Sequence, residues 1–138
     1  MSAAARPYNR AMAESYRSWE PVRDLPQGGS RLVELRDDAA GLSIALEFDL
    51  RPGELLHLVF HSPLAHRRSS FEVFIRMWRM EVPHLLSLVE NSRWIEWLHE
   101  ESDGRYVSAT LAHYVITTSR DFIELLAADP PETEWRAA

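Results

Sequence analysis

The sequence predicts a single α+β domain, with two or three helices packed on one antiparallel sheet of six or seven strands. Three observations support this fold class. The chain has 138 residues, the usual size of one domain. Short runs in which apolar and polar residues alternate recur between turn signals, while helical spacing of apolar residues is confined to a few segments. We expect residues 1–28 to form an N-terminal helix and a connector, residues 31–127 the sheet core, and residues 128–138 a C-terminal tail.

The first predicted element is a helix over residues 7–19. Pro7 suits the first position of a helix, and the apolar side chains that follow recur at spacings of four, four and three: Tyr8, Met12, Tyr16 and Trp19. Prolines and glycines between residues 21 and 29 then end the helix and form the connector.

A three-stranded meander is predicted next. Apolar and polar residues alternate over the nine positions from Leu42 to Leu50, so the even-numbered side chains face the core. Residues 31–36 before this run and 54–61 after it show the same period, and turn-forming residues separate the three runs. Three strands joined in this way form consecutive hairpins.

The second half of the chain is predicted to add strands and one helix. Residues 65–80 fit either a strand or a helix, and both interpretations stay open. A helix over residues 92–102 begins at a cap formed by Asn91 or Ser92 and ends at Gly104. Pro130 and Pro131 end the sheet, after which we expect Trp135 to hold the tail on the body. The remaining strands are predicted over residues 85–90, 111–117 and 122–127.

Composition excludes several kinds of chemistry. Hydrophobic residues make up 46% of the chain, which is typical of a globular protein. The absence of cysteine excludes disulfides, thiolate nucleophiles and sulfur-ligated metal sites. The formal net charge of −6 disfavours nucleic acid and anionic membranes as partners. No signal-like apolar segment and no run near the roughly 20 apolar residues of a membrane span occur, so we expect a cytoplasmic protein.

No motif predicts a catalytic residue, a metal ligand set or a cofactor. His57 and His61 are four residues apart, but in a strand their Cα atoms would lie about 13 Å apart, too far to share one ion. His99-Glu100 lacks a second histidine at the spacing of a zinc protease, and the five glycines form no phosphate-binding loop. One alternative is kept, a small-ligand site or enzyme with a pocket on the sheet lined by four residues: His57, His61, His113 and Glu124.

One tryptophan is predicted to contact a partner. Trp97 lies at the border between the apolar and charged faces of the 92–102 helix. Exposed tryptophans surrounded by acidic groups are typical of the places where basic protein partners bind. The predicted partner-binding residues are Trp97, Glu96, Glu100, Glu101 and Asp103.

Two blocks of the sequence resemble a group of small bacterial proteins without an assigned activity, some of which are similar to immunity proteins encoded beside polymorphic toxins. The first block spans residues 89–102; the second comprises residues 113–118, Asp121, residues 123–126, Pro130 and Pro131. The resemblance covers about the last 50 residues and, loosely, residues 53–65. It implies a small cytoplasmic protein that binds another protein, and no catalytic residues carry over from the group.

The function expected from these observations is non-enzymatic. An immunity-type inhibitor would occlude a cognate basic toxin by charge and an exposed aromatic patch. A further alternative is a homo-oligomeric structural module, such as a homodimer in which an exposed strand edge pairs with its copy.

Overall fold

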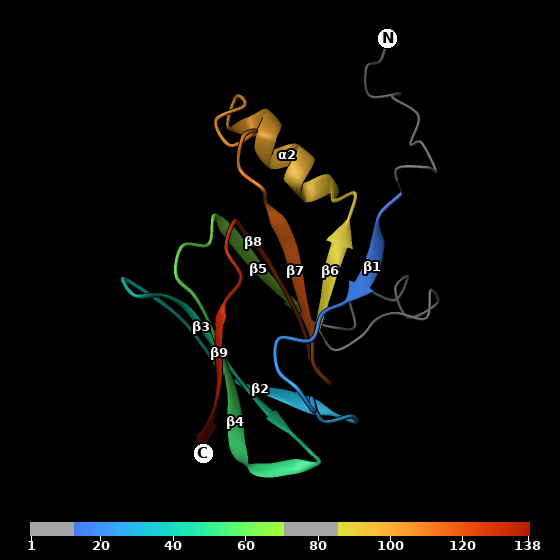
Figure 1. Cartoon of the computed structure of the whole chain (residues 1–138), viewed down its shortest axis with the longest axis vertical. Coiled ribbons are helices and arrows are strands. Elements are labelled where there is room, and N and C mark those ends of the chain that lie inside the picture. Colours follow the sequence, from blue (N-terminus) through green and yellow to red (C-terminus); the bar gives the residue numbers. More distant parts are fainter. Residues whose placement is uncertain (1–12, 71–85) are drawn as a thin grey trace.

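Two antiparallel sheets form the body of the molecule, as the computed structural model shows for residues 13–70 and 86–138 (Figure 1). The first sheet has five strands in the order β1-β6-β7-β8-β5, and the second has four in the order β2-β3-β4-β9. The five-stranded sheet consists of β1 (Ser15–Ser18), β6 (Leu86–Glu90), β7 (Ala112–Thr117), β8 (Asp121–Ala127) and β5 (Ala65–Ser70). The four-stranded sheet consists of β2 (Ser30–Asp38), β3 (Gly41–Phe48), β4 (Arg51–Phe60) and β9 (Glu132–Ala137).

The core lies between the inner faces of the two sheets. The alternation in β3 places Leu42, Ile44, Leu46 and Phe48 there, all fully buried. They belong to one cluster with side chains of both sheets, among them Leu56, Leu58, Phe60, Leu86, Tyr114, Ile116, Ile123 and Leu125. The rings of Phe60 and Tyr114 meet edge to face across the sheets at 5.1 Å. Burial of this continuous apolar layer stabilises the two-sheet arrangement.

The predicted meander is confirmed. Strands β2, β3 and β4 follow one another as antiparallel neighbours, and Ile44 lies opposite Leu35 on one side and Leu58 on the other. Strands β6, β7 and β8 also lie where apolar runs predict them. The helix α2 (Arg93–Glu101) begins at its cap residue Ser92, one of the two caps predicted.

The predicted α+β class is wrong, because the described residues are mainly β, with one short helix and two sheets rather than one. Residues 15–18, expected at the end of an N-terminal helix, form β1 and pair with β6. Tyr16 and Trp19 are three residues apart, which gives one face in a helix but opposite faces in a strand. Tyr16 packs with Val89 on the outer face of the sheet, whereas Trp19 packs against the main core. The earlier part of the predicted helix, up to residue 12, lies outside the described residues.

The predicted C-terminal tail also contains a strand. The two prolines stand between β8 and the final segment, but β9 then pairs antiparallel with β4. Trp135 does hold this segment on the body, since it packs against the core and meets Phe48 at 5.6 Å. Of the ambiguous stretch 65–80, residues 65–70 form β5, and the remainder lies outside the described residues. Within the described ranges, no helix has the length and apolar character to cross a membrane.

Candidate functional site: the α2 surface and the buried relay beneath it

The helix α2 begins at a sharp turn that follows β6. Asn91 has a φ angle of 57°, and this turns the chain away from the sheet. Ser92 then caps the helix, because its Oγ accepts a hydrogen bond from the Ile95 amide at 3.1 Å. The Arg93 amide, which has no backbone acceptor within the first turn, donates a hydrogen bond to a Glu14 carboxylate oxygen at 2.9 Å. The start of α2 is therefore fixed by side-chain contacts.

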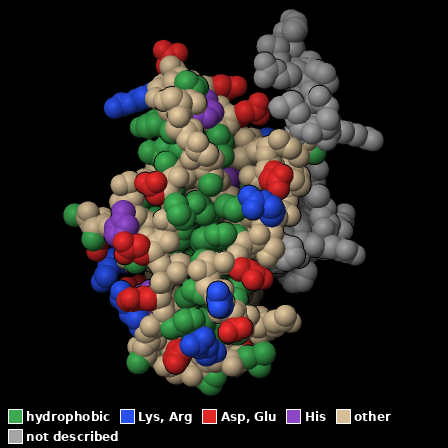
Figure 2. Space-filling view, in the orientation of Figure 1, with side chains coloured by type: hydrophobic (Ala, Val, Ile, Leu, Met, Phe, Trp, Pro, Cys, Tyr) green, Lys and Arg blue, Asp and Glu red, His purple; other side chains and the backbone are tan. Residues whose placement is uncertain are grey.

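The α2 surface consists of Glu96, Trp97, Glu100, Glu101 and Asp103. The carboxylate residues are all exposed, and acidic side chains gather around α2 at the top of Figure 2. Glu100 and Glu101 follow Trp97 by three and four residues, so they lie one turn away on the same side of the helix. Trp97 itself is 48% exposed, and no residue of α2 is fully buried. The five residues predicted to contact a partner thus share one exposed end of the molecule.

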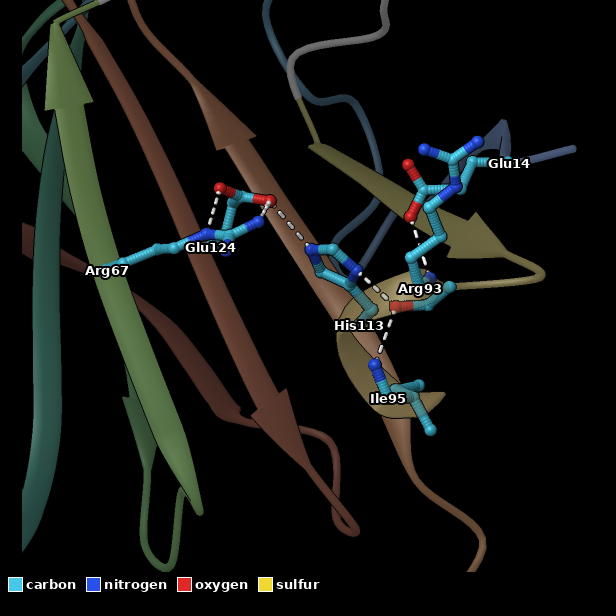
Figure 3. Close-up of polar contacts among 7 residues, drawn as sticks. Glu14, Arg67, Arg93, Ile95, His113 and Glu124 are labelled. Carbon is cyan, nitrogen blue, oxygen red and sulfur yellow. Dashed lines mark hydrogen bonds and ion pairs between the residues drawn. The ribbon is translucent and has the colours of Figure 1, made fainter. Parts of the chain in front are cut away.

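A chain of polar contacts, the buried relay, runs through Arg67, Glu124, His113 and Ser92 to the start of this helix (Figure 3). Ser92 Oγ lies 2.8 Å from His113 Nδ1, and His113 Nε2 lies 2.9 Å from Glu124 Oε1. Arg67 contacts both oxygens of Glu124, with Nε at 2.6 Å from Oε2 and a terminal nitrogen at 3.0 Å from Oε1. The relay therefore links β5, β8 and β7 to the cap of α2.

The middle of the relay is buried, which makes its hydrogen bonds obligatory. His113 is 2% exposed and Glu124 3% exposed. All contacts are satisfied together when Arg67 and His113 Nε2–H donate to the Glu124 carboxylate, the Ser92 hydroxyl donates to Nδ1, and the Ile95 amide donates to Ser92. Burial alone would raise the pKa of the Glu124 carboxyl, but hydrogen bonds from His113 and Arg67 and the charge of Arg67 outweigh burial and lower this pKa.

Trp94 packs beside the relay from the first turn of α2. Its ring meets the His113 imidazole edge to face at 5.3 Å. The Arg67 guanidinium lies over the same indole, 4.1 Å from the ring centre. Arg67 thus contacts α2 directly through Trp94 as well as indirectly through the relay.

Ser92, His113 and Glu124 are the residue types of a nucleophilic triad, but their contacts favour a structural task. In a catalytic triad the imidazole turns Nε2 to the nucleophile and Nδ1 to the carboxylate, and here the two nitrogens are reversed. Ser92 is only 7% exposed and already caps α2, while Glu124 is held by Arg67. A hollow lined by residues around Trp19 and Leu25, and another lined by His57 and its neighbours, include none of the three. The arrangement therefore supports anchoring of α2 more than acyl transfer.

The four residues of the alternative pocket do not converge. His113 and Glu124 meet in the buried relay, whereas His57 lies on β4 in the other sheet, opposite Glu134. His61 follows β4 and pairs with Glu132 at 3.2 Å on the surface. A hollow of about 340 Å³ on that sheet is lined by His57, Val59, Glu132, Thr133, Glu134 and Arg136. Among the residues that the structure describes, no three histidine or carboxylate side chains are grouped to hold a metal ion.

Sequence reasoning missed the roles of Arg67 and Trp94 in this site. One signal was present, since His113 and Glu124 each interrupt a strand whose other central residues are apolar. A polar residue in such a position needs a buried partner. The identity of the partner depends on the register of β5 beside β8, which places Arg67 opposite Glu124. That register is not encoded in any local pattern.

Comparison with known proteins adds no assignment, because no protein-family model, curated protein or solved structure matches this chain.

Proposed function

We propose that the protein is a non-enzymatic binding protein that docks a basic protein partner on the α2 surface, as an immunity-type inhibitor docks on a toxin domain. The observation that supports this role most strongly is the exposure of Trp97. Trp97 is 48% exposed, and it is the only aromatic residue among the exposed large apolar residues that the structure describes. Burial of a tryptophan against a partner is one of the largest single contributions to protein–protein affinity.

The charges around Trp97 favour a cationic partner. Four exposed carboxylate residues lie on α2 or directly after it, within six positions of Trp97, in a chain whose formal net charge is −6. Such a field accelerates encounter with a positively charged surface and disfavours acidic partners. A toxin domain that cleaves nucleic acid has a cationic substrate cleft of this kind, and an inhibitor of it would act in the cytoplasm.

The test is binding to the product of the gene beside this one. We expect a stoichiometric complex by size-exclusion chromatography and rescue of growth when both genes are expressed. By calorimetry, Trp97→Ala should weaken the affinity at least about tenfold, as expected for a hot-spot residue. Leu50→Ala is the matched control, because Leu50 is 71% exposed in the turn between β3 and β4 and should change the affinity less than about twofold.

Three results would contradict this function. The first is the absence of both a complex and growth rescue. The second is an equal loss of affinity in the Trp97 and Leu50 variants, since binding would then not be centred on α2. The third is covalent labelling of Ser92 by a fluorophosphonate probe, which would identify it as a nucleophile.

A further inference from the structure

The buried relay has one end in solvent and the other end at the first turn of α2. The Arg67 side chain is 51% exposed, whereas that of Glu124 is 4% exposed. Beyond His113 the chain of contacts ends on the Ile95 amide, through the cap residue Ser92. Residues on β5, β8 and β7 are thereby linked to the cap of α2 (Figure 3). Arg67 and His113 also contact the helix directly, through the ring of Trp94.

Such contacts matter at the start of α2 because the helix is short and its residues are at most partly buried. A helix of nine residues is too short to be stable in water by itself. None of its residues is fully buried, so apolar packing holds it less firmly than it holds the strands. The cap at Ser92 and the Glu14 contact to the Arg93 amide therefore carry a large part of the attachment of the first turn.

The orientation of Ser92 in turn depends on His113. The hydroxyl can present a lone pair to the Ile95 amide while it donates its proton to Nδ1, which fixes its rotamer. His113 is fixed on its other side by Glu124, and Glu124 is fixed by the two contacts from Arg67. Removal of Arg67 would leave a buried carboxylate without its charged partner, and the strain would pass to His113.

We propose that Arg67, Glu124 and His113 are positioning residues for the α2 surface: they hold the first turn of α2 through Ser92, and so set how Trp97 is presented without touching the partner. The effect on a partner rests on the proposed function, whereas the hold on the helix does not. Arg67 also stacks on Trp94, and the variants below separate this second contact from the relay.

The hold on the helix is tested on the purified full chain without any partner. Amide hydrogen exchange is measured at Ile95, whose N–H is bonded to Ser92 Oγ, and at Ile44 in the core strand β3 as the internal reference. Ser92→Ala should raise the exchange rate at Ile95 about fivefold relative to Ile44, as loss of a helix cap does. Arg67→Met should raise it about threefold.

A double variant tests whether Arg67 acts on Ile95 through Ser92 or through a separate contact. In the double variant Arg67→Met/Ser92→Ala, exchange at Ile95 should exceed that of Ser92→Ala alone by less than about 1.5-fold, because the link to the relay is already cut. Arg31→Met is the matched control, since it removes a surface ion pair with Glu47 on the other sheet and should leave Ile95 unchanged. The proposal would be overturned if Arg67→Met left the exchange rate at Ile95 unchanged. It would also be overturned if Arg67→Met raised that rate by the same factor in the wild type and in the Ser92→Ala background.

A variant at the centre of the relay tests whether the effect of Arg67 on Ile95 passes through His113. His113→Asn keeps an oxygen acceptor near the position of Nδ1 for Ser92 but loses the donor to Glu124. Exchange at Ile95 should then become insensitive to Arg67→Met, because the relay is interrupted at its centre. A persistent effect of Arg67→Met in this background would assign the hold to Trp94 stacking and contradict the relay.

The effect on binding uses the neighbouring gene's product as the probe. Arg67→Met should weaken its affinity about threefold, in proportion to the loosening of α2, although Trp97 is intact. Loss of affinity in Trp97→Ala but not in Arg67→Met would overturn the positioning role. Coupled exchange at Ile95 with no effect of Trp97→Ala on affinity would instead reject the proposed function and leave the hold on the helix standing.

Discussion

The outer faces of the two sheets carry similar residues in very different surroundings. On the four-stranded sheet, Arg31 pairs with Glu47, with side chains 61% and 27% exposed. Red and blue side chains lie next to one another over this sheet in the lower half of Figure 2. On the five-stranded sheet, the pair of His113 and Glu124 is 2% and 4% exposed. Both pairs bridge neighbouring antiparallel strands, and they differ strongly in exposure.

The difference shows where polar residues determine structure. Water can replace either partner of an exposed ion pair, so such a pair adds little stability. Water reaches the buried relay much less, and each partner there depends on the others. The first face can therefore change its charges freely, while the second fixes the position of α2 and its exposed surface.

The largest expected effect is loss of the buried carboxylate. Glu124→Ala leaves Arg67 and His113 without their acceptor and should lower the free energy of unfolding by about 3–5 kcal/mol. Glu47→Ala removes the exposed counterpart and should lower it by less than about 1 kcal/mol. Urea denaturation of the two variants makes the comparison, and equal losses would abolish the distinction between the two faces.

The two faces should also respond to acid in different pH windows. The pKa of the Glu124 carboxyl is lowered from 4.5 by His113 and Arg67 despite burial, so its contribution to stability is complete above about pH 5.5. It is lost as the pH falls below 4.5 towards the folded-state pKa. We expect the stability advantage of the wild type over Glu124→Gln to be constant near neutrality and to shrink at about pH 3. An advantage independent of pH would contradict this.

His57, on the four-stranded sheet, should lose its contribution in a higher pH window. Burial, followed by the charge of Arg136, lowers the pKa of its imidazole from 6.5. The unfolded chain then binds more protons near this pH, so stability decreases as the pH falls through 6.5. His57→Gln should lose less stability than the wild type between about pH 7.5 and about pH 5.5. Identical pH profiles in urea unfolding would show that His57 does not contribute.

The smallest effect on stability is expected at Trp97. Because its side chain is half exposed, Trp97→Ala should change the free energy of unfolding by less than about 1 kcal/mol. Trp135→Ala is the matched control, since Trp135 packs against Phe48 and under Arg51 and should destabilise by about 3 kcal/mol. A large loss in Trp97→Ala by thermal or urea unfolding would make it a packing residue instead of a contact residue.

Local patterns predicted the elements whose signals are unambiguous. The alternation in β3 specifies a strand and is confirmed as far as Phe48, while Leu50 lies exposed in the turn that follows. Of the two caps that the sequence allowed for α2, Asn91 and Ser92, the structure uses Ser92. Tyr16 and Trp19 fit a helix or a strand equally well, so pairing with β6 decided the outcome for β1. The short strand β9 was missed because two prolines precede it and only Thr133 and Trp135 face inward.

The site was predictable only in part, because its two halves depend on different information. The five residues of the α2 surface follow from helical spacing and charge, although exposure of a border residue such as Trp97 depends on how α2 sits on the sheet. The relay depends on strand order and register, which bring Arg67 beside Glu124 across 57 positions of sequence. Sequence alone could not decide whether His57 and His113 share a pocket for the same reason, and the structure places them on different sheets.

The most direct test of the central claim is an amide-exchange footprint of the protein bound to the neighbouring gene's product. If the protein acts through the α2 surface, residues 94–103 should become protected in the complex. Strands β4 and β9 of the four-stranded sheet should exchange as in the free protein. Protection of β4 and β9 with unchanged exchange across α2 would contradict the account.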